Sequence, residues 1–146
     1  MTAAPGPVSD FAPSLVEEGP LRALLLHSEP GEVLEALHDC PGLEWAAASE
    51  PDEVARSLAE HDPQVVFSIK TASFTGPSHG EALGWKSVRW FHVGGSGRDH
   101  LPAWDPARVT VTDSKGVLAP FLAERAMAGL FALGTGLVNH LREQRE

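Results

Sequence analysis

The stretch SVRWFHVGGSG, residues 87–97, decides the fold, because an apolar run stops there at three glycines within four residues. A short apolar run that ends at glycines is typical of a buried strand followed by a tight turn. Similar runs lie at residues 21–27, 65–69 and 109–112, and a weaker, alanine-rich run lies at residues 43–48. The sequence therefore predicts five short strands, the fourth of them at residues 87–93.

Helical patterns separate several of these strands. Apolar residues at helical spacing predict one helix at residues 32–39 and a second one after Ser49, which we expect to be its N-cap with Asp52 three residues on. Three residues should form the inner face of this second helix: Val54, Ala55 and Leu58. Residues 70–80 are rich in Thr, Ser, Gly and Pro and predict a loop, whereas residues 119–144 predict one long helix.

Short apolar strands that alternate with helices indicate an open parallel α/β sheet, because parallel strands need crossover connections and are buried on both faces. Five such strands fit the flavodoxin-like order, in which ligands bind beyond the carboxyl ends of the strands. We expect residues 1–20 to be a flexible tail and residues 21–146 to form one domain.

Composition narrows the class of protein. The apolar fraction is 42% and the charged fraction 21%, as in ordinary globular proteins, and the formal net charge is -9. An acidic balance argues against nucleic acid and anionic membranes as partners. The longest uncharged apolar stretch, residues 126–138, is shorter than the roughly 20 residues of a membrane span. The single cysteine, Cys40, fits a reducing cytoplasm.

The glycine-rich loop after the fourth predicted strand is the main candidate site. Gly94, Gly95 and Gly97 let the backbone turn with positive φ and expose successive N–H groups, which form a nest able to hold a carboxylate. A tight strand-to-helix turn is the alternative interpretation. The loop is not a dinucleotide fingerprint, because Gly95-Ser96-Gly97 has no third glycine three residues later.

Two segments carry a resemblance to a known family. SVRWFHVGGSGRDHL (residues 87–101) and VTVTDSKGVLAPFLAERAMAGLFALGTGLVNHLREQRE (residues 109–146) resemble D-isomer-specific 2-hydroxyacid dehydrogenases. The matching features are a glycine-rich loop that ends in Asp and His, a strand of the VTVT type, and a helix start of the Ala-Pro-x-x-Ala-Glu type at Ala119. The likeness covers roughly residues 21–146 and is close only from Ser87 onward.

The resemblance implies roles for several residues. Backbone amides at Ser96 and Gly97, next to Gly95, would bind the substrate carboxylate. The loop after the third strand would border the same site, which points to three further residues: Lys70, Thr71 and Ala72. A cation at Lys70 would attract an anionic substrate, although a solvated lysine explains that residue equally well.

The chain also departs from the family pattern. Arg98 replaces a small apolar residue, which points either to an unusual substrate or, as we prefer, to solvent. Asp113 replaces the usual Asn and cannot donate as an amide does.

The resemblance predicts the substrate-binding half of an enzyme that interconverts 2-keto acids and D-2-hydroxy acids with NAD or NADP. The nucleotide-binding turn and the catalytic Arg, Glu and His of the family cannot be placed in this chain, so we expect it to bind no cofactor alone and to be catalytically silent. A stand-alone small-acid-binding or protein-interaction module is the alternative. We also expect a homodimer or other self-association through the apolar helix at residues 119–144.

Other reactive side chains carry weaker signals. His79, His92 and His100 lack metal-site spacing with carboxylates or cysteines, so we predict no metal site. A phosphoacceptor domain would need acidic residues after the first and third strands, where this chain has His27-Ser28 and Ser68-Ile69.

Overall fold

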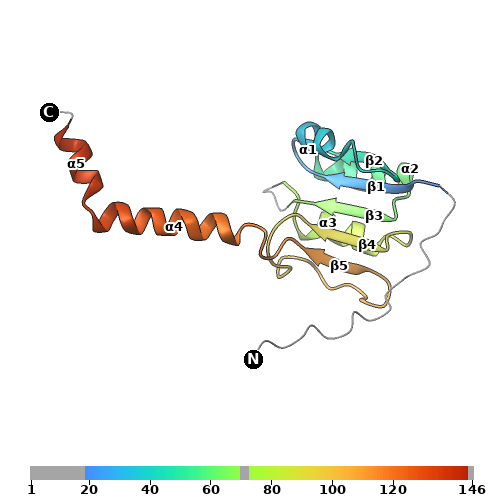
Figure 1. The fold of residues 1–146 in the computed structure, drawn as a ribbon. Helices are drawn as coiled ribbons and strands as arrows, with labels where there is room; N and C mark the ends of the chain where they lie inside the picture. The colour runs from blue at the N-terminus through green and yellow to red at the C-terminus, as the bar shows by residue number, and fades with distance from the viewer. Residues whose placement is uncertain (1–18, 70–72, 145–146) are drawn as a thin grey trace, which may run out of the picture.

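The computed structural model describes residues 19–69 and 73–144, and its centre is a five-stranded sheet (Figure 1). The strands are β1 (Leu21–Leu26), β2 (Leu43–Ala48), β3 (Val65–Ser68), β4 (Trp90–Val93) and β5 (Thr110–Asp113). All neighbouring strands pair in parallel, in the order β2-β1-β3-β4-β5. This is the flavodoxin-like order, so the predicted fold class is confirmed.

Helices connect the strands and continue the chain after the sheet. They are α1 (Pro30–Leu37), a 3₁₀ turn (Pro51–Glu53), α2 (Val54–His61), α3 (Gly76–Gly84), α4 (Ala119–Gly134) and α5 (Leu137–Glu143). In the described part of the chain, no helix is long and apolar enough to cross a membrane. The predicted tail, residues 1–20, lies almost wholly outside the described residues.

The hydrophobic core lies on one face of the sheet. Alternate residues of a strand point to opposite faces, so Phe91 and Val93 of β4 enter the core while Trp90 and His92 do not. The core side of the sheet packs against Val54 and Leu58 of α2 and against residues of α3.

The start of α2 differs from the prediction in two details. Glu50, not Ser49, is the N-cap of the 3₁₀ turn, and Glu53 accepts hydrogen bonds from the backbone N–H groups of Ser49 (2.8 Å) and Glu50 (3.3 Å). Glu53, which has the longer side chain, therefore makes the capping contact that was expected of Asp52. Ala55 is exposed, because the inner face of so short a helix consists of positions four apart, Val54 and Leu58.

Helix α3 occupies the second half of the segment predicted as a loop. Gly76, Pro77 and Gly80 give it a poor intrinsic helix propensity. Burial of His79, Ala82 and Leu83 against the core compensates for that deficit. Tertiary packing therefore overrides the local signal here.

The carboxyl-terminal helix begins at Ala119 as predicted, but it is interrupted. Gly136 has a φ of 67°, a left-handed conformation, and separates α4 from α5. Figure 1 shows α4 running away from the sheet, with α5 at its far end. No residue of α4 is buried.

Candidate functional site

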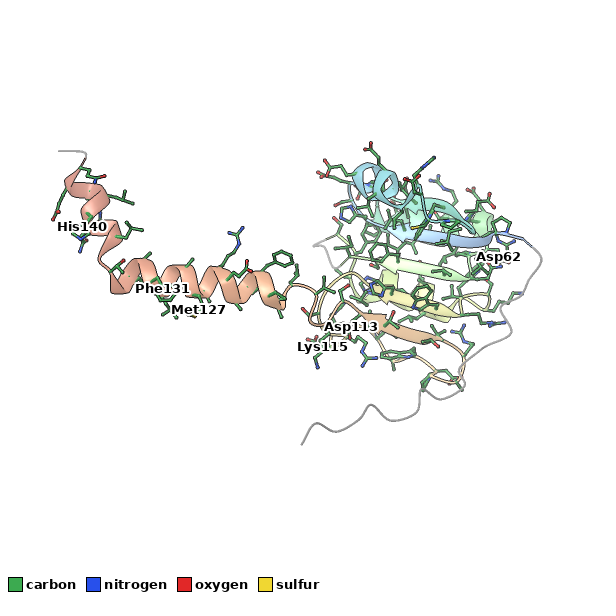
Figure 2. The ribbon with its side chains drawn as sticks, in the orientation of Figure 1. Asp62, Asp113, Lys115, Met127, Phe131 and His140 are labelled. Atoms are coloured by element: carbon green, nitrogen blue, oxygen red, sulfur yellow. The ribbon has the colours of Figure 1, made fainter. Side chains whose placement is uncertain are left out.

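The carboxyl ends of three neighbouring strands meet at one edge of the sheet. The register places Ser68 of β3 beside Val93 of β4, and Val93 beside Asp113 of β5. Figure 2 shows Asp113 and Lys115 at this edge, at the opposite end of the sheet from Asp62. In flavodoxin-like sheets ligands bind beyond this edge, so the loops that leave it form the candidate site.

Two glycines of the loop after β4 are required for different physical reasons. The backbone N–H of Gly94 donates to the carbonyl of Ser68 at 2.8 Å, and a Cβ at this position would lie 2.7 Å from Ile69 Cγ1 and 2.9 Å from Phe67 Cε2. Gly97 has a φ of 92°, which side-chain-bearing residues rarely adopt. Close packing therefore requires glycine at position 94, and the positive φ requires glycine at position 97.

After Gly94, one carbonyl of this loop is bonded to the segment that follows β5, and the next three amides have no bonded acceptor among the described residues. The Gly95 carbonyl accepts a hydrogen bond from the Ser114 backbone N–H at 2.9 Å. Among the described residues, no acceptor is bonded to the N–H groups of Gly95, Ser96 and Gly97. Three successive unbonded amides can accept a small anion. The carboxylate of Asp99 lies near Gly97 and opposes an anion there.

Arg98 connects the loop after β4 to the end of β5. Its Nη1 donates to the Val111 carbonyl at 3.2 Å, and its Nε lies 3.2 Å from Asp113 Oδ2. Asp113 also accepts a hydrogen bond from the Lys115 backbone N–H at 2.9 Å. Arg98 is exposed, as expected, but its guanidinium is also held by these two contacts with β5. Asp113 accepts hydrogen bonds in these contacts, and a carboxylate can do this without the N–H donors that Asn would supply.

Three polar residues that the sequence did not bring together lie beneath this edge. Ser68 Oγ is 2.9 Å from His79 Nε2, and the His79 ring lies edge-on to His100, with 5.5 Å between ring centroids. His79 is only 1% exposed. Burial, together with the smaller effect of the neighbouring His100, lowers the pKa of His79 from 6.5 to about 4. At neutral pH His79 is therefore an uncharged hydrogen-bonding group.

Within the part of the chain that the structure describes, two ring nitrogens of this histidine pair have no hydrogen-bond partner, namely His79 Nδ1 and His100 Nε2. No group of three or more His, Cys, Asp or Glu side chains in the described residues is arranged to hold a metal ion. We therefore interpret the His79–His100 pair as a buried structural contact beneath the carboxyl edge of the sheet.

The opposite face of the sheet carries a second polar cluster. Thr112 Oγ1 accepts a hydrogen bond from Trp90 Nε1 at 2.8 Å and lies 2.8 Å from His92 Nδ1. His92 Nε2 is 3.2 Å from Ser114 Oγ. These bonds connect β4 to β5 and to the first residue after β5.

The amino end of the sheet has a cluster of its own around Asp62, the left-handed C-cap of α2. Its carboxylate accepts hydrogen bonds from Ser87 Oγ (2.6 Å), Trp85 Nε1 (3.0 Å) and Arg22 Nη2 (3.2 Å). The Ser87 and Trp85 bonds, with the charge of Arg22, lower the pKa of this carboxyl. This cluster joins elements far apart in sequence and lies away from the candidate edge.

Lys70, Thr71 and Ala72, the other predicted site residues, lie outside the described residues.

A hollow of about 260 Å³ lies between α2 and β2, far from the glycine loop. It is lined by Ala46, Ala47, Arg56, Ser57, Glu60 and His61. Arg56 is already paired with Glu53 at 3.3 Å, which leaves the hollow with little free positive charge.

Compared with models of protein families, with curated proteins and with solved structures, the chain matches none in any of the three comparisons. Its chemistry is therefore inferred from the site itself.

Proposed function

We propose that the chain binds a small carboxylate at the loop after β4, as the substrate-binding part of an NAD(P)-dependent oxidoreductase acting on 2-keto or D-2-hydroxy acids. The observation that carries the proposal is the run of unbonded amides from Gly95 to Gly97 at the carboxyl edge of the sheet. The likeness of residues 87–101 and 109–146 to D-2-hydroxyacid dehydrogenases supports the choice of acid.

The loop is suited to a carboxylate because its donors are held in place before binding. Gly94 is anchored to Ser68, the Gly95 carbonyl to Ser114, and Arg98 to Asp113. Preorganised backbone N–H groups bind a carboxylate without the ordering cost of flexible side chains. The Ser96 hydroxyl is exposed and offers a further donor.

The glycine loop is not itself a nucleotide-binding turn. Residues 94–97 lack the third glycine of a dinucleotide-binding turn, so no hydride-transfer step is assigned to these residues. The chain's own part in the reaction is to bind and orient the carboxylate. Transfer of hydride would require a nicotinamide domain.

The test replaces one amide and leaves its neighbours in place. Ser96→Pro removes the central N–H, whereas Ser96→Ala, the matched control, keeps that N–H and removes only the hydroxyl. Pyruvate and oxalate titrations, followed by amide chemical shifts, should move Gly95 and Gly97 in the parent chain and in Ser96→Ala but not in Ser96→Pro. Unmoved loop amides in the parent chain would exclude this site.

A protein-interaction module is the second candidate function, and a specific observation favours it. Helix α4 exposes apolar side chains along its whole length. Exposed apolar surface of this extent marks an interaction site. The two functions are compatible, because the carboxylate loop and α4 use different residues.

A further inference from the structure

A histidine at the carboxyl edge of the sheet lies between two hydroxyl groups. His92, near the end of β4, has its Nδ1 2.8 Å from Thr112 Oγ1 and its Nε2 3.2 Å from Ser114 Oγ. Both ring nitrogens are therefore engaged, one by β5 and the other by the first residue after it. A serine hydroxyl next to an imidazole nitrogen is the arrangement in which a serine acts as a nucleophile.

A third hydrogen bond of this cluster bears on which nitrogen of His92 carries the proton. The indole N–H of Trp90 can only donate, so Thr112 Oγ1 accepts it at 2.8 Å. A hydroxyl oxygen has a second lone pair, which can accept the N–H of His92 Nδ1. In that tautomer Nε2 has its lone pair directed at Ser114 Oγ and can take the serine proton.

Ring contacts and strand pairing hold His92 in this position. Its ring centroid is 5.3 Å from that of Phe67 and 6.3 Å from that of Trp90. The strand that carries it, β4, is paired on both sides, with β3 and with β5. A base held in this way on a rigid element needs little reordering before it acts.

Ser114 is better placed for a substrate than the serine of a second Ser–His contact, that of Ser68 with His79. Ser68 Oγ lies closer to its histidine, at 2.9 Å, but both residues are only 1% exposed. Ser114 is partly exposed, and Figure 2 shows its neighbours Asp113 and Lys115 at the carboxyl edge of the sheet. A small molecule can therefore approach Ser114 and not Ser68.

The loop that carries unbonded amides lies next to Ser114. The Ser114 backbone N–H donates to the carbonyl of Gly95 at 2.9 Å. Among the described residues, the amides from Gly95 to Gly97 have no bonded acceptor. Backbone N–H groups beside a nucleophile are the donors that stabilise the oxyanion formed in acyl transfer.

We propose that Ser114 is the nucleophile of an ester-cleaving site, in which His92 is the general base and Thr112 is a positioning residue that orients the ring. Ser114 Oγ attacks the carbonyl carbon of an ester, and its proton passes to His92 Nε2. The bond between that carbon and the alcohol oxygen breaks, the leaving oxygen takes the proton, and Ser114 is acylated. Water then attacks the acyl carbon with His92 as base, which releases a carboxylic acid and restores the serine.

The partners of His92 restrict the substrates to esters with a good leaving group. Within the described residues, the ring is bonded by hydroxyl groups and not by a carboxylate. In serine proteases a buried carboxylate stabilises the imidazolium that forms, whereas a neutral hydroxyl only orients the ring. We therefore expect cleavage of aryl esters of small acids and no cleavage of amides.

The first test labels the chain with a small alkyl fluorophosphonate, whose phosphorus bonds to an activated serine oxygen as fluoride leaves. The intact mass of the parent chain should increase by a single adduct, which peptide mapping should place on Ser114. Ser114→Ala should stay unlabelled. His92→Gln should be labelled about 100-fold more slowly, because a positioned general base contributes roughly 10²–10⁴ in rate.

Two matched controls separate this site from other serines and histidines. Ser57→Ala replaces a partly exposed serine on α2, and His38→Gln replaces an exposed histidine after α1. Both should be labelled as fast as the parent chain. A parent chain that is not labelled, or that is labelled no faster than His92→Gln, would overturn the proposal, and the first of these outcomes needs no variant to be folded.

The role of Thr112 is tested by the hydrolysis of p-nitrophenyl acetate. Thr112→Val removes the hydroxyl and should lower kcat with little change in KM, whereas Thr112→Ser returns the hydroxyl and should recover most of the rate. Circular dichroism checks that both variants are folded. Equal kcat values in the two variants would overturn the assignment of Thr112.

The esterase activity goes beyond the proposed carboxylate binding and shares with it only the loop amides. Ser114→Ala leaves these amides in place, so pyruvate should still shift the Gly95 and Gly97 signals in this variant while labelling is lost. Labelling of Ser114 in a parent chain that does not respond to pyruvate would support the esterase site and contradict carboxylate binding alone.

Discussion

The buried histidine beneath the carboxyl edge makes the stability of the domain depend on pH. The pKa of His79 falls from 6.5 to about 4 in the folded chain, mainly because burial disfavours the charged ring. The unfolded chain therefore binds a proton more tightly than the folded chain does. Stability from this residue is complete above pH 6.5 and is lost as the pH falls from 6.5 towards 4.

The size of the effect follows from the two pKa values. Between pH 7 and pH 5 the unfolded chain gains about 0.7 proton at this residue and the folded chain gains about 0.1. Proton linkage converts this difference into a loss of about 2 kcal/mol in the free energy of unfolding. The lowered carboxyl pKa values of Glu53 and Asp62 act at lower pH and do not contribute in this range.

The assay is urea unfolding at pH 7 and pH 5, for the parent chain and for His79→Gln. The Gln side chain retains a polar partner for Ser68 but does not titrate, so the pH-dependent loss should be about 2 kcal/mol smaller in this variant. His38→Gln, at an exposed histidine, is the control and should keep the full loss. If the parent chain and His79→Gln lose the same stability between pH 7 and pH 5, burial of a neutral His79 is not the cause.

Three further predictions follow from the contacts around the sheet. Gly94→Ala should lower the free energy of unfolding by about 1–3 kcal/mol, because its Cβ would overlap Ile69 and Phe67. Gly95→Ala, where a Cβ meets nothing, should change it by less than about 0.5 kcal/mol. Equal values for the two variants in chemical denaturation would contradict the packing argument. A double-mutant cycle of Arg98→Gln and Asp113→Asn should give a coupling free energy below about 1 kcal/mol, because Arg98 is half exposed. A larger coupling energy would mean that the ion pair is better shielded from water than the exposure of Arg98 indicates. Asp62→Asn should be less stable than the parent chain at pH 7, and because the pKa of Asp62 is lowered, thermal melting should show the difference shrinking as the pH falls below about 4.

The five strands were predictable because each is a short apolar run next to turn residues, and β1 is indeed buried over Ala23, Leu24, Leu25 and Leu26. Helices between the strands indicated parallel pairing for β1 to β4, whereas no helix separates β4 from β5. Helix α3 was not predictable from local signals, since its helicity comes from burying His79 and Leu83 rather than from the propensity of its glycines. The break at Gly136 was also missed, because apolar spacing continues across it.

The position of the candidate site was predictable, but its contacts were not. Glycines after an apolar strand mark a tight turn in any sequence, and that signal located residues 94–97. The partners of Arg98 and His79 depend on the register of neighbouring strands and on α3, which no local pattern reveals. Arg98 was expected to be solvent-exposed, and it is, but its ion pair with Asp113 was missed because sequence alone cannot identify a carboxylate 15 positions away.

The bonds around Asp62 have a consequence for how this domain can change during evolution. They join the start of β1, the end of α2 and the segment before β4 at one end of the sheet, while the loop after β4 lies at the other. Substitutions in that loop leave these bonds intact. The loop after β4 can therefore vary in sequence while the other end of the sheet preserves the register of the strands.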